Sequence, residues 1–294
     1  MMSNSHSTQF YCEERIPRAL SHFITEKRII HDILYDKADD AIFSLQSSGS
    51  KIFLMKTKNE DDVEMFLAND STFEITFGNF LAILPKEDKI IVLLKHNGKE
   101  MFVVSKTLTQ KREFTLSFVD VSDVCAICSS GRDDYLFLMT KIGFIYKYDT
   151  YSCEKEQFSI NFCSSYMCVT ENLKYLAISE THIIKIYSIE DWKDLRTCGE
   201  DKTCSYNGVS FLNERVLIAA EKHEIKNHEY GFCQCIDVGS LKLFDINSGN
   251  LLKEIRNVSP DIKISIPRNI SVCTDRVLLF SQEIDRPRIF KIEI

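Results

Sequence analysis

The chain has 294 residues, of which 44% are apolar, and a formal net charge of −7, so it can bury a sizeable core in one domain. The negative charge argues against a protein whose whole surface follows nucleic acid. No apolar stretch is long enough for a membrane-spanning helix and the start lacks the blocks of a signal peptide, so we expect a cytoplasmic or nuclear protein without membrane insertion.

Six segments with the alternation of β-strands recur along the chain. Their starts are 39, 54, 39, 57 and 48 residues apart. In chain order they are Ile52–Lys56, Ile91–Lys95, Ile145–Asp149, Ile184–Ser188, Leu241–Asp245 and Ile289–Glu293.

Each segment follows an almost continuous apolar run, which is typical of a strand buried on both faces. These runs begin 11, 11, 10, 9, 25 and 12 residues upstream, at Ala41, Phe80, Tyr135, Tyr175, Val216 and Val277. A further strand precedes each run across a polar turn, as in Ile33–Asp40, and a fourth follows, as in Leu251–Ile255. Four strands at roughly this period predict an all-β propeller of six four-stranded blades, with seven as the alternative.

The resemblance to a known family appears in the fifth and third units. Leu241–Ile255 resembles the third and fourth strands of a WD repeat, with Phe244-Asp245 in the place of Trp-Asp, and Gly143–Asp149 is similar. The full Trp-Asp and the preceding Gly-His are absent, so the hydrogen-bond network of the family is not carried over. The resemblance implies a degenerate WD-repeat propeller that binds other macromolecules.

The two ends of the chain predict how the ring closes. Residues 1–294 form one domain, and the last blade lacks an outer strand, which Thr8–Cys12 is placed to supply. In the rest of residues 1–28 we predict a short helix over Arg18–Arg28.

One unit departs from the spacing, because blade five carries roughly 15 extra residues between its second and third strands. We predict a loop over residues 221–238, and long loops on rigid scaffolds often carry function. Its candidate partner-binding residues are His223, His228, Tyr230 and Phe232. The alternative is a tolerated insertion without a role.

Cysteine and histidine patterns give no metal site and no cofactor. The loop spacing of His223, His228, Cys233 and Cys235 matches no common zinc motif, and a Cys-x-Cys pair in a strand is explained by packing. Cys125 and Cys128 form a C-x-x-C pair that falls in a strand, so we favour burial over redox chemistry. None of the common catalytic motifs is present, and we expect no enzyme activity.

The function expected from these patterns is a non-catalytic scaffold or adaptor that binds proteins in a complex. Six blades and Ile30–Asp32 also resemble the small propellers of the COPII coat and the nuclear pore. Blades three to six resemble the non-catalytic WD-repeat subunit of tRNA guanine-N7 methyltransferase, which implies RNA contact. Candidate phosphate contacts are the arginines of the last blade, Arg268, Arg276, Arg286 and Arg288, with ordinary surface charge as the alternative.

Overall fold

The computed structural model describes residues 29–58, 61–69, 80–94, 100–162, 164, 166–199, 204–226, 235–255, 257–259, 262–263, 267–273, 276–281 and 288–291. These residues form antiparallel β-sheets, with one 3-10 turn at Val121–Asp123. No described helix is long and apolar enough to cross a membrane.

Five sheets have four strands each, and in every one the strands are adjacent in chain order. Blade one contains β1 (Ile29–Asp36), β2 (Ala41–Ser48), β3 (Lys51–Lys58) and β4 (Asp61–Asn69). Blade two contains β5 (Leu81–Leu84), β6 (Lys89–Leu94), β7 (Glu100–Ser105) and β8 (Lys111–Glu113). Blade three contains β9 (Val124–Ser129), β10 (Tyr135–Thr140), β11 (Phe144–Asp149) and β12 (Lys155–Ser159).

Blade four contains β13 (Met167–Val169), β14 (Tyr175–Ser179), β15 (Ile184–Ser188) and β16 (Asp194–Cys198). Blade five contains β17 (Cys204–Phe211), β18 (Val216–Lys226), β19 (Cys235–Asp245) and β20 (Leu251–Ile255). A short pair, β21 (Asn257–Ser259) and β22 (Ile262–Lys263), precedes a three-stranded sheet of β23 (Pro267–Cys273), β24 (Arg276–Ser281) and β25 (Arg288–Lys291).

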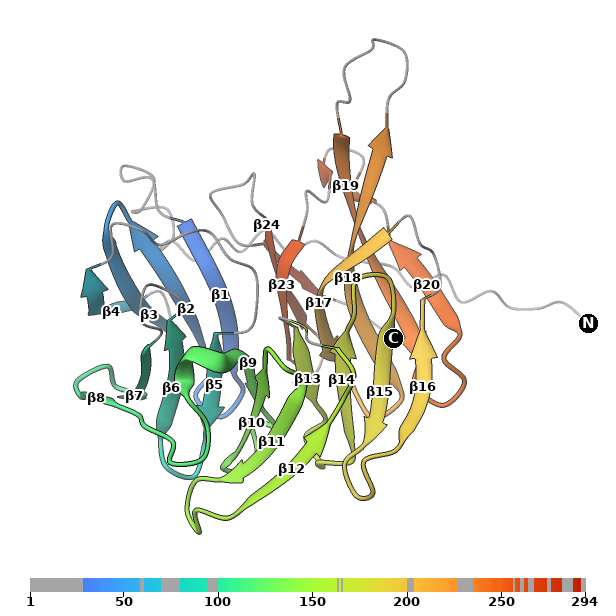
Figure 1. Cartoon of the computed structure of the whole chain (residues 1–294). Helices are drawn as coiled ribbons and strands as arrows, with labels where there is room; N and C mark the ends of the chain where they lie inside the picture. Colours follow the sequence, from blue (N-terminus) through green and yellow to red (C-terminus); the bar gives the residue numbers. More distant parts are fainter. Residues whose placement is uncertain are drawn as a thin grey trace, which may run out of the picture.

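The sheets are arranged as a ring around a central channel (Figure 1). The first strand of each sheet contacts the first strand of the next, from β1 through β5, β9, β13 and β17 to β23. Because β23 also contacts β1, the ring is closed. This arrangement confirms the predicted all-β propeller.

The number of four-stranded blades differs from the prediction. The described residues contain five, rather than six or seven. The segment expected to form the sixth blade gives the three-stranded sheet β23–β25. The predicted closing strand, Thr8–Cys12, and the short helix predicted over Arg18–Arg28 lie outside the described residues.

The core lies between neighbouring blades. Phe43 and Leu45 of β2 pack in one cluster with Phe80 and Ile90 of the next blade, and all four are fully buried. Similar clusters join blades two and three, three and four, and four and five. In β2, β6, β10 and β14 nearly every side chain is buried, so both faces of these second strands are covered, which explains the continuous apolar runs in the sequence.

The strand order predicted for blade two was wrong by one strand. The run at Phe80 forms the innermost strand β5, so Ile91 lies in the second strand and β7 takes the third place. Strands β5, β6 and β7 are all mostly buried. Three successive apolar strands leave no contrast in polarity that would mark the second one.

The predicted loop of blade five is largely a β-hairpin. Strands β18 and β19 pair without interruption from Val216↔Asp245 to Lys226↔Cys235, so only residues 227–234 of the predicted loop lie outside the described residues. The structure, rather than any clear alternation of polar and apolar residues over His223–Lys226, places this stretch in a strand. Its position between the second and third strands of blade five is as predicted.

Candidate interaction surfaces

The hairpin of β18 and β19 projects from one end of the ring (Figure 1). Among the residues that the structure describes, the neighbouring strand β17 pairs with β18 as far as Cys204↔His223. Beyond that pair the described strands bond to each other alone, as a two-stranded ribbon. Such a ribbon gains little stability from the blade core.

The base of the hairpin is fixed by a buried carboxylate. Glu221 is fully buried, accepts a hydrogen bond of 2.7 Å from Ser240 Oγ, and forms an ion pair with Lys242. A buried charge persists only where partners compensate its lost hydration. The hairpin therefore leaves the blade from a defined point.

A cavity of about 530 Å³ opens at one end of the central channel. It is lined by the ends of the innermost strands and by the turns that follow them. Lys37 of blade one reaches across to Glu171 of blade four, with 3.4 Å between Nζ and Oε1. Both side chains are more than half exposed, so this ion pair contributes little to stability.

The hairpin and the cavity lie at opposite ends of the ring. Glu214 lines the cavity, and β18 begins just after it at Val216. From there the strand runs eleven residues away from the cavity. A partner bound at the hairpin would leave the cavity mouth accessible.

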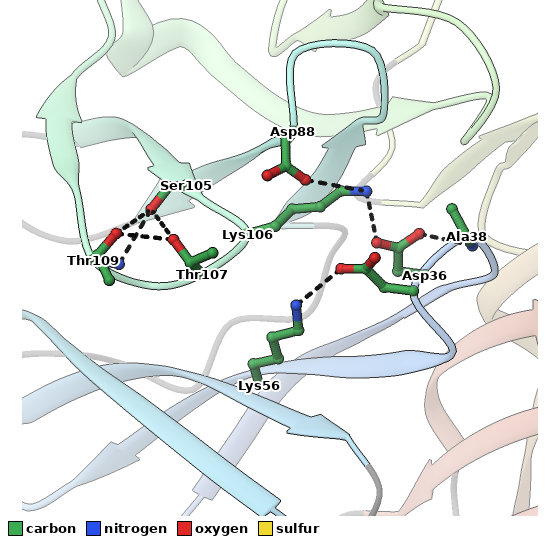
Figure 2. Close-up of polar contacts among 9 residues, drawn as sticks. Asp36, Ala38, Lys56, Asp88, Ser105, Lys106, Thr107 and Thr109 are labelled. Carbon is green, nitrogen blue, oxygen red and sulfur yellow. Dashed lines mark hydrogen bonds and ion pairs between the residues drawn. The ribbon is translucent and has the colours of Figure 1, made fainter.

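Charged side chains hold the junction of blades one and two beside the cavity. Figure 2 shows Lys106 between Asp36 and Asp88. The Nζ of Lys106 lies 2.7 Å from Asp36 Oδ2 and 4.0 Å from Asp88 Oδ1, and both Lys106 and Asp36 are buried. Lys56 donates a hydrogen bond of 2.9 Å to Asp39, which lowers the pKa of that carboxyl.

A second contact joins the same blades deeper in the ring. The buried carboxylate of Asp32 accepts hydrogen bonds from the backbone N–H groups of Phe80 at 2.7 Å and Leu81 at 2.8 Å. From the other side, Ser129 Oγ accepts a bond of 2.9 Å from the N–H of Ile83. Blade two is thus tied to both of its neighbours by hydrogen bonds.

The residues predicted as sites are only partly covered by the described structure. His223 lies in β18, with its backbone opposite Val238, whereas His228, Tyr230 and Phe232 fall outside the described residues. The backbones of three of the predicted arginines lie in the last sheet: Arg268 is in β23, Arg276 in β24 and Arg288 in β25. Arg286 falls outside the described residues. Partner and phosphate binding by these residues stay predictions.

The C-x-x-C pair lies in a strand, as predicted. Cys125 and Cys128 lie in β9, both side chains are buried, and burial raises the pKa of the Cys128 thiol. Cys125 Sγ donates to the backbone oxygens of Met139 and Ser164. In the described part of the chain, no three His, Cys, Asp or Glu side chains converge in a group that could hold a metal ion.

The sequence analysis predicted neither the cavity nor the two polar contacts between blades one and two, Lys106–Asp36 and Asp32 with the backbone of the next blade. The residues that line the cavity, Asp32 and Asp36 among them, lie within or just after the innermost strands of successive blades, whereas Lys106 follows β7, the third strand of blade two. The recurrence of polar residues at that place, in Asp36-Lys37, Thr170-Glu171 and Asn213-Glu214, is the signal that could have identified the cavity mouth.

A ring of radial antiparallel sheets around a channel defines the chain as a β-propeller. Two solved structures share the fold. The chain is similar to hydrazine synthase of Kuenenia stuttgartiensis, with a TM-score of 0.63 and 11% identity over 88% of this chain and 76% of that one. It is also similar to the β-propeller domain of Cps50 (Swd1) from Myceliophteria thermophila, with a TM-score of 0.55 and 14% identity over 90% of this chain and 84% of that one.

At 11% and 14% sequence identity, the similarity to these two structures shows only that the fold is shared. No protein-family model matches the chain, and no curated protein matches it in sequence.

Proposed function

We propose that the chain is a non-catalytic scaffold of the WD-repeat kind, which binds other proteins in a cytoplasmic or nuclear complex. A rigid ring offers several separate surfaces, because its turns and edges vary while the blades hold them in fixed positions. The likeness to the β-propeller domain of Cps50 (Swd1) supports this general role.

The observation that carries the proposal is the projecting hairpin. The paired strands extend past the last pairing with β17, so this part of the chain adds surface without closing the blade. Its base at Glu221 is buried and compensated, which gives the surface a fixed origin. Fixed, projecting backbone costs less ordering entropy on binding than a free loop does.

The test replaces residues 224–237 by an Asn-Gly turn that joins His223 to Val238, two residues already paired across the hairpin. We expect the melting temperature to stay within a few degrees of the wild type. In affinity purification from the cells that make the protein, followed by quantitative mass spectrometry, at least one protein partner is lost. Tyr151→Ser, which changes a residue 91% exposed in the turn between β11 and β12, is the matched control and keeps all partners.

Retention of every partner by the shortened variant would contradict the role of the hairpin. Treatment of the complex with nuclease separates protein from RNA contacts, because protein-held partners remain bound. The identity of the co-purified partners also distinguishes the two family resemblances. A methyltransferase catalytic subunit would favour the tRNA methyltransferase complex, and coat proteins would favour the coat and nuclear-pore propellers.

A further inference from the structure

An ion pair crosses the mouth of the cavity at the end of the central channel. Lys37 and Glu171 both line this cavity, and the Nζ of Lys37 lies 3.4 Å from Oε1 of Glu171. Lys37 directly follows β1 in blade one, and Glu171 lies just after β13 in blade four. The two side chains therefore extend from turns at the same end of the ring.

The order of the blades places these two turns on opposite sides of the channel. In the closed ring β5 and β9 lie between β1 and β13 on one side, and β17 and β23 lie between them on the other. A contact between the side chains of the two turns therefore passes over the channel itself. The flexible four-carbon stem of lysine gives Lys37 the reach that this contact requires.

The ion pair is only weakly favoured over its separated form. The side chain of Lys37 is 54% exposed and that of Glu171 is 65% exposed. Exposed ion pairs gain little because water hydrates the separated charges, and their measured strengths correspond to a paired-to-separated ratio of roughly 1.4 to 5. The two side chains therefore meet and separate readily.

The turns that carry the pair are anchored more firmly than the pair itself. In blade one the buried Asp36 accepts a hydrogen bond of 3.1 Å from the N–H of Ala38 and pairs with the buried Lys106. In blade four the buried hydroxyl of Thr170 accepts bonds from the N–H groups of Lys174 at 3.0 Å and Tyr175 at 2.9 Å. The mouth can thus open by movement of two side chains while both turns stay in place.

We propose that the Lys37–Glu171 ion pair is a strap that gates the cavity. While the pair is formed, it restricts entry of molecules larger than water past the mouth. When it separates, a small ligand can enter the cavity, whose volume of about 530 Å³ lies within the range of ~300–1,000 Å³ that is usual for ligand sites. The proposal does not depend on the hairpin of blade five.

The strap is sensitive to ionic strength because both of its charges are exposed to solvent. The Debye length falls from about 10 Å at 0.1 M salt to about 3 Å at 1 M, which is comparable to the separation of the two charges. Salt therefore weakens the pair and raises the share of molecules whose cavity is open.

Thiol labelling measures entry into the cavity, because the half-buried Cys168 lines it. The folded full-length chain is treated with N-ethylmaleimide at alkaline pH, since burial raises the pKa of the Cys168 thiol. Peptide mass spectrometry then gives the labelling rate of each cysteine separately. Cys153, which is exposed in the turn between β11 and β12, reports the reactivity of the reagent itself.

Substitutions remove the strap or exchange its charges. Lys37→Ala and Glu171→Ala each remove one side of the pair, and the Lys37→Glu/Glu171→Lys double variant forms it again with the charges exchanged. Lys174→Ala is the matched control, because Lys174 is an exposed cation in the same turn as Glu171 and lies outside the lining of the cavity.

We expect both single variants to label Cys168 about two- to sixfold faster than the wild type, as full opening of so weak a pair requires. The double variant and Lys174→Ala label Cys168 at the wild-type rate. Raising the salt from about 0.1 M to about 1 M speeds the labelling of Cys168 in the wild type and leaves Lys37→Ala unchanged. The rate at Cys153 stays constant throughout.

Equal labelling of Cys168 in the wild type and both single variants would overturn the proposal. A double variant as fast as the single ones, or a rise of the same size in Lys174→Ala, would overturn it as well. The salt series on the wild type needs no substitution, so an unchanged rate at Cys168 refutes the strap even if a variant fails to fold. These outcomes leave the proposed function intact, because partner loss in the hairpin variant is measured independently.

Discussion

Replacing Asp32 by alanine should cost a large part of the stability of the ring. Its carboxylate accepts backbone bonds from Phe80 and Leu81 of the next blade, at 2.7 and 2.8 Å. Hydrogen bonds to a charged group contribute about 1.5–3 kcal/mol each. Loss of both inter-blade bonds therefore lowers the free energy of unfolding by about 3–6 kcal/mol, a large share of the ~5–15 kcal/mol of a typical domain.

Urea unfolding followed by fluorescence measures this loss, because the chain has one tryptophan. Trp192 stacks on Phe158 of the neighbouring blade, with 5.2 Å between the ring centroids, so its emission reports on packing between blades. Asp32→Asn keeps an acceptor oxygen without the charge, and we expect about half of the loss. Glu156→Ala, which removes an exposed carboxylate paired with Lys147, is the control and costs less than about 1 kcal/mol. A loss below about 1 kcal/mol for Asp32→Ala would refute the inter-blade role of this residue.

Two further substitutions test the packing and the junction of blades one and two. Aspartate in place of Leu136, Leu176 or Leu217, each fully buried in a second strand, should prevent soluble expression, and tolerance of all three would mean that these strands are not in the core. Lys106→Met should cost about 3–5 kcal/mol in urea unfolding because it leaves the buried Asp36 carboxylate without its cation. The Asp36→Leu/Lys106→Met double variant should recover part of that loss, and a double variant no more stable than Lys106→Met would argue against the ion pair as the cause.

The second and third strands were predictable where polarity changes along the chain. The apolar run predicted to begin at Tyr175 forms β14 from that residue, and Ile184–Ser188 forms β15 with the predicted bounds, because a buried run is followed by an alternating one. Blade two has three apolar strands in succession, so the sequence did not show which of them is the second. The first strand was therefore taken for the second, and the second for the third. The hairpin of blade five was predicted to be a loop because the prediction used only the number of extra residues between the two strands. That number does not show whether the extra residues pair with each other.

The contacts that join blades could not be predicted, since they depend on closure of the ring. The donors that meet Asp32 lie 48 and 49 residues along the chain, and Lys37 meets Glu171 across 134 residues. No local pattern connects positions that far apart. The sequence did indicate that blade five carries extra residues between its second and third strands, but it did not indicate the cavity.

The contact between β1 and β23 determines that the ring closes late in folding. The two strands span residues 29–36 and 267–273, so a ribosome must synthesise every residue from β1 to β23 before they can meet. The blades themselves are built from neighbouring strands and can form earlier, as local hairpins. Until the ring closes, β1 lacks its neighbour β23, and nascent chains are most exposed to aggregation in this interval.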